Sequence, residues 1–374
     1  MKIRIEIFFI AFCLSAANIF AQARASEIIE NSLQAIGGRK EIAKIQNIRA
    51  IADCTGPNGK YTTGIYSADN SRLIFRQVKQ NGDVYQGQTN GQFFWKKNEK
   101  TGEFSLAGRR EVFVWRSHNF QKIALSLDEF FRELSFAGEE NFKGKTAVKL
   151  RGKDELGNRA ELFFDKETGL MLGFDIQNPF KSEPEKIRTS FDEWRKIGAI
   201  KLPSKVTATD TQGDFVLNFR EIVLNKTDEK IFAAPLQVKA MNELLDIHNE
   251  QRAAHFNRDA KLLVSVFADD FTDIGRGKIR KPTREESFNR FQTYFKNSTF
   301  LEWDDITPPV IKVSDDATLG YTIVHKKVRL LAQDENGKEQ EETEVFAWIA
   351  VYQKNDGKWK LTAIASTNTP ETDR

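Results

Sequence analysis

Four histidines, His118, His248, His255 and His325, are the side chains best suited to acid–base or metal chemistry. His248 and His255 lie seven residues apart on one helical face, which separates them by about 10 Å along a helix axis. One metal ion does not bridge that distance without further ligands, and the sequence has no His-Glu-x-x-His or Cys-x-x-Cys motif. We therefore expect no metal and no cofactor. We take His118 as a surface residue and His255 as a buried or half-buried contact for a ligand.

His325 belongs to a strand pattern in which Tyr321, Ile323 and His325 alternate with other residues. If that face points into an internal pocket, the imidazole can hydrogen-bond a ligand. If it points outward, His325 is a surface or dimer residue. The alternation leaves both possibilities open, because the opposite face also carries apolar side chains.

Three carboxylates, Asp259, Asp270 and Asp273, are candidates for proton transfer, because an apolar cavity raises the pKa of a carboxyl group toward neutrality. Asp273 is the first choice, since it follows Phe271 by two residues and shares its face in an extended segment. The alternative for this group is helix capping or exposure to water.

Aromatic residues near these groups are candidates to line a pocket, although such rings also form ordinary cores. The ligand-contact set that we expect is His255, Tyr294, Trp303, His325 and Trp348, with Asp273 catalytic only if the protein is an enzyme. A basic loop at residues 276–281 either holds an anionic group or is simply solvated.

The elements that position these residues lie in the last third of the chain. Three helical stretches precede long strands joined by tight turns, and Thr283 with Glu286 forms a capping box at the third helix. The segments at 260–271 (Ala-Lys-Leu-Leu-Val-Ser-Val-Phe-Ala-Asp-Asp-Phe) and 357–364 (Gly-Lys-Trp-Lys-Leu-Thr-Ala-Ile) resemble the SnoaL-like branch of the nuclear transport factor 2-like superfamily. The resemblance implies an α+β cone, a curved cystatin-like sheet with three helices, over residues 239–374. It also implies that, in an isomerase or cyclase, a carboxylate inside the cone is the base.

Residues 24–238 begin with helical patterns and then alternate with period two through many strands, with one helix expected at residues 126–134. This pattern predicts a curved antiparallel half-barrel with covering helices. The helix that ends in Ala-Ile-Gly-Gly at 35–38, the segment Leu-Phe-Phe-Asp-Lys-Glu-Thr-Gly-Leu at 162–170 and the closing stretch 224–236 resemble the LolA-like family of periplasmic carriers of lipoproteins and lipids.

Residues 1–23 have the pattern of a secretory signal peptide. A positive start at Lys2 and Arg4 precedes an apolar run, and Ala-Gln-Ala at 21–23 is a small-x-small cleavage site. Removal of this segment takes away two basic residues and one acidic residue, so the net charge of +3 falls to +2. Near-neutral charge and export both argue against a nucleic-acid partner.

We therefore expect a periplasmic or secreted two-domain protein that binds a hydrophobic or lipid-like molecule without catalysis and makes transient contact with the envelope. The 30 phenylalanines suit large apolar cores or cavities. Two alternatives stay open: an isomerase or cyclase that uses Asp273, and a scaffold that forms homodimers through its C-terminal sheet.

Overall fold

A computed structural model describes residues 20–69, 71–333 and 338–369. Most of the expected signal peptide, residues 1–19, lies outside the described residues. The chain divides into two compact units, of which the first ends at Ala233 and the second begins at Ala234; Phe104–Leu106 is grouped with the second. The expected boundary at residue 238 falls inside helix α5 (Leu236–Phe256), which starts directly after Pro235. Among the described residues, no helix is both long enough and apolar enough to span a bilayer.

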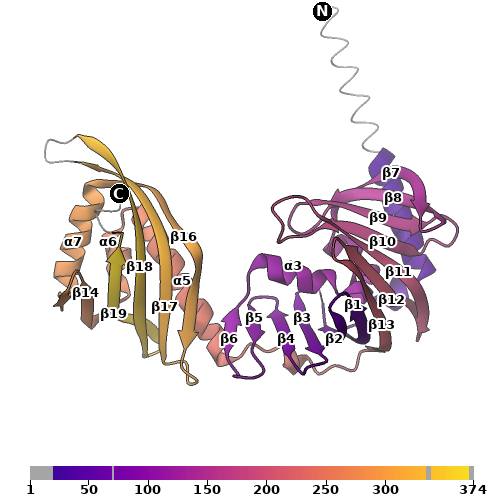
Figure 1. Cartoon of the computed structure of the whole chain (residues 1–374), viewed down its shortest axis with the longest axis horizontal. Coiled ribbons are helices and arrows are strands. Elements are labelled where there is room, and N and C mark those ends of the chain that lie inside the picture. The colour runs from indigo at the N-terminus through magenta and orange to yellow at the C-terminus, as the bar shows by residue number, and fades with distance from the viewer. Residues whose placement is uncertain (1–19, 70, 334–337, 370–374) are drawn as a thin grey trace, which may run out of the picture. The chain divides into compact units, whose positions relative to one another are not determined.

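The first unit is built on one antiparallel sheet of 13 strands, in the order β6-β5-β4-β3-β2-β1-β13-β12-β11-β10-β9-β8-β7 (Figure 1); its edge strand β6 is the short segment that is grouped with the second unit. Its strands are β1 (Ile48–Gly56), β2 (Gly59–Ser67), β3 (Arg72–Lys79), β4 (Val84–Asn90), β5 (Phe94–Lys97), β6 (Phe104–Leu106), β7 (Arg132–Phe142), β8 (Lys145–Lys153), β9 (Arg159–Asp165), β10 (Met171–Gln177), β11 (Lys186–Ile197), β12 (Ile200–Asp210) and β13 (Gly213–Leu224). Strands that are neighbours in the sequence pair with each other, except β6 and β7, and β1 also pairs with β13 near the end of the unit. The sheet is open, because β6 and β7 lie at its two edges.

Short helices lie against this sheet. They are an N-terminal helix over residues 20–35, α2 (Arg39–Ile42), α3 (Arg109–Ser117) and α4 (Phe120–Leu125), with 3-10 turns η1 (Leu127–Glu129) and η2 (Glu229–Phe232). The helix expected at residues 126–134 is wrong, since only the η1 turn forms there and β7 starts at Arg132. The apolar stripe behind that expectation is nevertheless buried: Leu127, Phe130 and Phe131 join the core.

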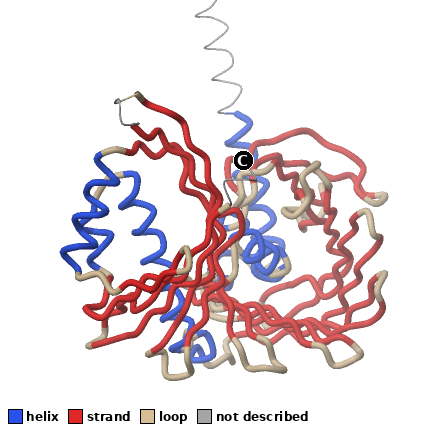
Figure 2. Tube along the Cα trace, turned by 60° about the vertical axis from the view of Figure 1, so that its left-hand side comes forward, coloured by secondary structure: helices blue, strands red, loops and turns tan. Residues whose placement is uncertain are grey.

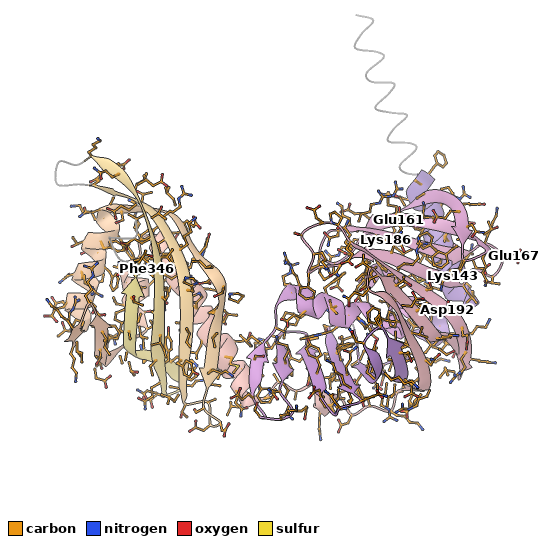
Figure 3. All side chains as sticks on the ribbon, viewed as in Figure 1. Lys143, Glu161, Glu167, Lys186, Asp192 and Phe346 are labelled. Carbon is orange, nitrogen blue, oxygen red and sulfur yellow. The ribbon has the colours of Figure 1, made fainter. Side chains whose placement is uncertain are left out.

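Ion pairs lie toward the β7 end of this sheet. Lys143 pairs with Asp192 at 3.0 Å, and Lys186 lies 3.3 Å from Asp175. Figure 3 labels Lys143, Glu161, Lys186 and Asp192 in this part of the sheet. Lys143, Asp192 and Lys186 are exposed or half-exposed, so these pairs contribute little to stability, whereas the Asp175 carboxylate is only 5% exposed.

The second unit is a curved six-stranded sheet in the order β15-β14-β19-β18-β17-β16, with three helices on one face (Figure 2). Its elements are α5 (Leu236–Phe256), α6 (Ala260–Ser265), β14 (Phe267–Gly275), β15 (Lys278–Arg280), α7 (Arg284–Lys296), β16 (Ser298–Val313), β17 (Leu319–Gln333), β18 (Glu339–Asn355) and β19 (Lys358–Asn368). Strands β14 and β19 are parallel, and the other neighbours are antiparallel. The α+β class with large curved open sheets is therefore confirmed in both units.

Alternation along β17 separates the two faces of the second sheet. Thr322, Val324 and Lys326 are buried toward the helices, whereas Ile323 and His325 are exposed on the other face. The capping box predicted for α7 is confirmed: the Glu286 N–H donates to Thr283 Oγ1 at 3.1 Å, and the Thr283 N–H donates to Glu286 Oε2 at 2.7 Å.

Candidate functional site

A cavity of about 710 Å³ lies inside the first unit. Strands β2, β3 and β10–β13 supply its wall together with α3 and the loop after β10. Its apolar lining comes mainly from Phe75, Phe113, Trp115, Phe120 and Leu217. Two lysines, Lys60 and Lys79, also line it, so the cavity combines an apolar wall with a few charged groups.

His118 is one of the residues that line this cavity, which corrects its expected place on the surface. It caps the C-terminus of α3, and its Nδ1 lies 2.7 Å from the carbonyl oxygen of Val114. The imidazole contacts the rings of Phe75 and Phe120, at 5.1 Å and 5.7 Å between centroids. Burial among these groups lowers the pKa of His118, so the neutral ring is favoured.

The cavity wall depends on close packing of α3 on β4. Trp115 is 1% exposed, and its indole N–H donates to the Tyr85 hydroxyl at 2.9 Å. A Cβ atom on Gly87 would lie 2.1 Å from the Trp115 ring, so only glycine lets the indole lie flat on the strand. Burial raises the pKa of Tyr85, and its hydroxyl therefore keeps its proton.

A second cavity, of about 470 Å³, lies between the helices and the sheet of the second unit. Five of the six expected site residues line it: His255, Asp273, Tyr294, Trp303 and Trp348. Phe346 on β18, labelled in Figure 3, is another lining residue.

The aromatic wall of the second cavity holds His255 in place. Its ring stacks on Trp303 with 4.3 Å between centroids and meets Phe295 and Phe300 edge to face. The His255 Nδ1 lies 2.7 Å from the carbonyl oxygen of Gln251, one turn earlier in α5. Burial lowers the pKa of His255 to about 4, which keeps the ring neutral at ordinary pH.

Tyr294 and Asp273 stand at the polar side of this cavity. Burial raises the pKa of Tyr294 to about 12, so its hydroxyl is a donor rather than a base. Asp273 is 16% exposed and accepts from Arg290 Nη1 at 3.1 Å. The carboxylate is thus ion-paired and is not the isolated base that proton abstraction in an apolar site requires.

The other expected acid–base candidates lie elsewhere. Asp259 caps α6 by accepting from the Leu262 N–H at 2.8 Å, and Asp270 is exposed. His325 lies on the outer face of β17 and does not line the cavity, because the alternation turns its neighbours Val324 and Lys326 inward. Its expected ligand contact is therefore corrected to a surface position.

A buried polar cluster beside the second cavity was not expected from the sequence. Lys326, fully buried, donates to Asp305 at 2.6 Å, and Asp305 also bonds His248 Nε2 at 2.8 Å. Burial lowers the pKa of both Lys326 and His248. Burial alone would raise the pKa of Asp305, but its bonds to the two partners outweigh this and lower it. The Lys326 ammonium also lies 3.8 Å from the centre of the Trp303 ring, which ties the cluster to the cavity wall.

Searches against protein-family models and curated proteins found no match. Among solved structures, the chain is similar to a LolA superfamily protein from Nitrosomonas europaea (11% identity, 56% of this chain and 97% of that one, TM-score 0.43). It is similar to a DUF1329 family protein from Desulfovibrio piger (14%, 56% and 97%, TM-score 0.41). It is also similar to a calcium/calmodulin-dependent protein kinase II association domain from Xanthomonas campestris (21%, 37% and 94%, TM-score 0.27). These likenesses concern the fold, and at such scores they carry no argument about ligand or activity.

Proposed function

We propose that this chain is an exported, non-catalytic binding protein that holds hydrophobic or lipid-like molecules. The observation that carries the proposal is the presence of an internal cavity in each unit, about 710 Å³ and 470 Å³ in volume. Volumes of 300–1,000 Å³ with mostly apolar walls and a few polar groups are typical of small-molecule sites. Exposed residues at the rim of each pocket, such as Lys79 and Arg290, leave it open to solvent, and an apolar ligand would displace water from its apolar wall.

Solvent extraction of the purified chain, followed by mass spectrometry, tests this proposal. We expect lipid-like molecules in the extract. Two variants test the cavities separately, Ala208→Phe for the first and Ser366→Phe for the second, since both residues line a cavity and a phenyl ring there would take up part of the space that a ligand needs. Each variant should carry less ligand than the native chain. A ligand-free native chain that also fails to bind a neutral fluorescent probe would refute the proposal.

Export is part of the same proposal, and the N-terminal helix is compatible with it. Within the described part of this helix, the first buried residue is Ala25, two positions after the expected cleavage site at Ala23. Cleavage there would leave Ala25, Leu33 and Ile36 docked in the core. The intact mass of protein recovered from a bacterial periplasm should lack residues 1–23, whereas a full-length mass would contradict export with cleavage.

An alternative proposal is catalysis by Asp273. The position of this carboxylate in the cavity wall favours catalysis, whereas its ion pair with Arg290 disfavours it. A reaction with a candidate ligand that collapses in Asp273→Asn would establish it. An unchanged ligand after prolonged incubation would leave binding as the function.

A homodimer through the C-terminal sheet is a further proposal. On the outer face, Val310, Ile323, Ile349 and Ala365 are direct cross-strand partners on β16–β19. The first three are between 39% and 47% exposed. A continuous exposed apolar row of this kind is typical of an interaction surface.

A further inference from the structure

The two cavities share one polar feature, a histidine that is hydrogen-bonded to a helix backbone carbonyl, although they belong to different folds. Each wall contains one histidine whose Nδ1 lies 2.7 Å from the backbone carbonyl four residues earlier: Val114 for His118 and Gln251 for His255. A carbonyl oxygen only accepts hydrogen bonds, so Nδ1 carries the hydrogen in both rings. In a neutral imidazole the other nitrogen, Nε2, then has a free lone pair and is an acceptor.

Nε2 of both rings is without a hydrogen-bond partner among the residues that the structure describes, since each imidazole bonds through Nδ1. The Nδ1 edge is turned to the helix, so the Nε2 edge faces away from it, and both histidines line a cavity. The surrounding rings hold each imidazole in one orientation. An acceptor in such an apolar wall is poorly solvated and favours a ligand that brings a donor.

Each cavity also offers one hydroxyl near the same aromatic rings. Tyr85 and His118 both flank Phe75, at 6.2 Å and 5.1 Å between centroids. Tyr294 and His255 both flank Phe300, at 5.6 Å and 5.1 Å. The Tyr85 oxygen already accepts from Trp115, which leaves its own O–H free to donate. The pairing of an acceptor nitrogen with a donor hydroxyl matches a group that both donates and accepts.

We propose that both cavities select an apolar molecule that carries an uncharged hydroxyl group, which donates to Nε2 of His118 in the first unit and to Nε2 of His255 in the second. This inference rests on the proposed binding function and specifies its ligand class. The ligand oxygen accepts from the tyrosine hydroxyl in return. A carboxylate lacks the hydrogen that Nε2 accepts, so only the cations at the walls, Lys60 and Lys79 in the first cavity and Arg276 and Arg290 in the second, could offset the cost of burying its charge.

The test compares 1-dodecanol with its methyl ether, which has the same chain and oxygen but no O–H donor. Displacement of the neutral probe N-phenyl-1-naphthylamine from the full chain gives the affinities. We expect dodecanol to bind about 5- to 10-fold more tightly than the ether, the effect of one hydrogen bond in an apolar site. His118→Phe and His255→Phe should each remove the preference in one cavity, and the double variant should show none. His325→Phe, on the outer face, is the control that keeps it.

Nitrogen-15 spectra of the native chain provide a second readout that needs no variant. Dodecanol should shift the two Nε2 resonances and leave the Nδ1–H tautomer unchanged. Equal binding of alcohol and ether overturns the hydroxyl inference and leaves the binding function standing. Tighter binding of dodecanoate overturns it in favour of an anionic ligand. Failure of all three compounds to displace the bound probe overturns the hydroxyl inference, whereas failure of the probe itself to bind a ligand-free chain refutes the proposed function.

Discussion

Gly87→Ala tests the packing that shapes the first cavity. The new Cβ would lie 2.1 Å, 2.3 Å and 2.7 Å from Cε2, Cζ2 and Cδ2 of Trp115, whereas carbon atoms pack at about 3.5–4.0 Å. The indole must therefore move by more than 1 Å, by about the difference between these distances. Overpacking of this kind costs about 1–3 kcal/mol, and loss of the Trp115–Tyr85 hydrogen bond adds about 1 kcal/mol. Replacing glycine by alanine also stabilises the fold by about 0.4–1 kcal/mol, because it reduces the conformational entropy of the unfolded chain. We expect a net loss of about 1–3.5 kcal/mol.

Guanidinium unfolding of the full chain, followed by tryptophan fluorescence, measures this change. The matched control is Gly275→Ala, where the nearest atom would lie 3.5 Å from the new Cβ, an ordinary contact. In a Trp115→Phe background the bicyclic ring is gone, so Gly87→Ala should cost about 1–2 kcal/mol less there. Equal stability of the two glycine variants, or additive effects in the double variant, would refute the packing argument.

Three further predictions concern the second unit. Asp305→Asn should lower the free energy of unfolding in urea by about 3 kcal/mol, because it leaves the buried Lys326 ammonium without its carboxylate. Lys326→Met should lower it by less, and a larger loss in Lys326→Met than in Asp305→Asn would contradict this account. His255 binds fewer protons in the folded than in the unfolded chain between pH 6.5 and about 4, so stability should fall by up to about 3 kcal/mol as the pH is lowered through this window, and His255→Phe should flatten the curve. Ile323→Glu should convert a dimer to a monomer in light scattering while ligand affinity is unchanged, and a native monomer would dispose of the sheet interface.

Local patterns predicted only some elements of the two units. In the second unit, period-two alternation placed β17, β18 and β19, and the Thr283 capping box placed α7, whereas β14 and β15 were not predicted as strands. Helix α3 was missed, since Gly108 provides no side-chain cap and the helix has only nine residues. The helix expected after Ser126 was wrong, because burial of Phe130 and Phe131 does not require helical backbone.

The sequence predicted the position of a candidate site residue only where its side chain lies on a regular helix or strand. Tyr294 and Trp348, expected as pocket-lining aromatic residues, do line the cavity. The position of His325 was not predicted correctly, because Lys326 is a charged residue on the inward face and the alternation on β17 therefore carries no clear polarity signal. The partner of Asp273 comes from α7, 17 residues later, and that contact depends on how the helix packs against β14. The role of His118 depends in the same way on α3 and on rings from distant strands.

Native mass spectrometry of the full chain with 1-dodecanol in excess tests the central claim most directly. Two separate apolar cavities predict species with one and two bound molecules. A single substitution that narrows one cavity, Ala208→Phe or Ser366→Phe, should remove the species with two bound molecules. A native chain that stays at its unliganded mass throughout the titration would contradict the claim that these cavities bind an apolar ligand.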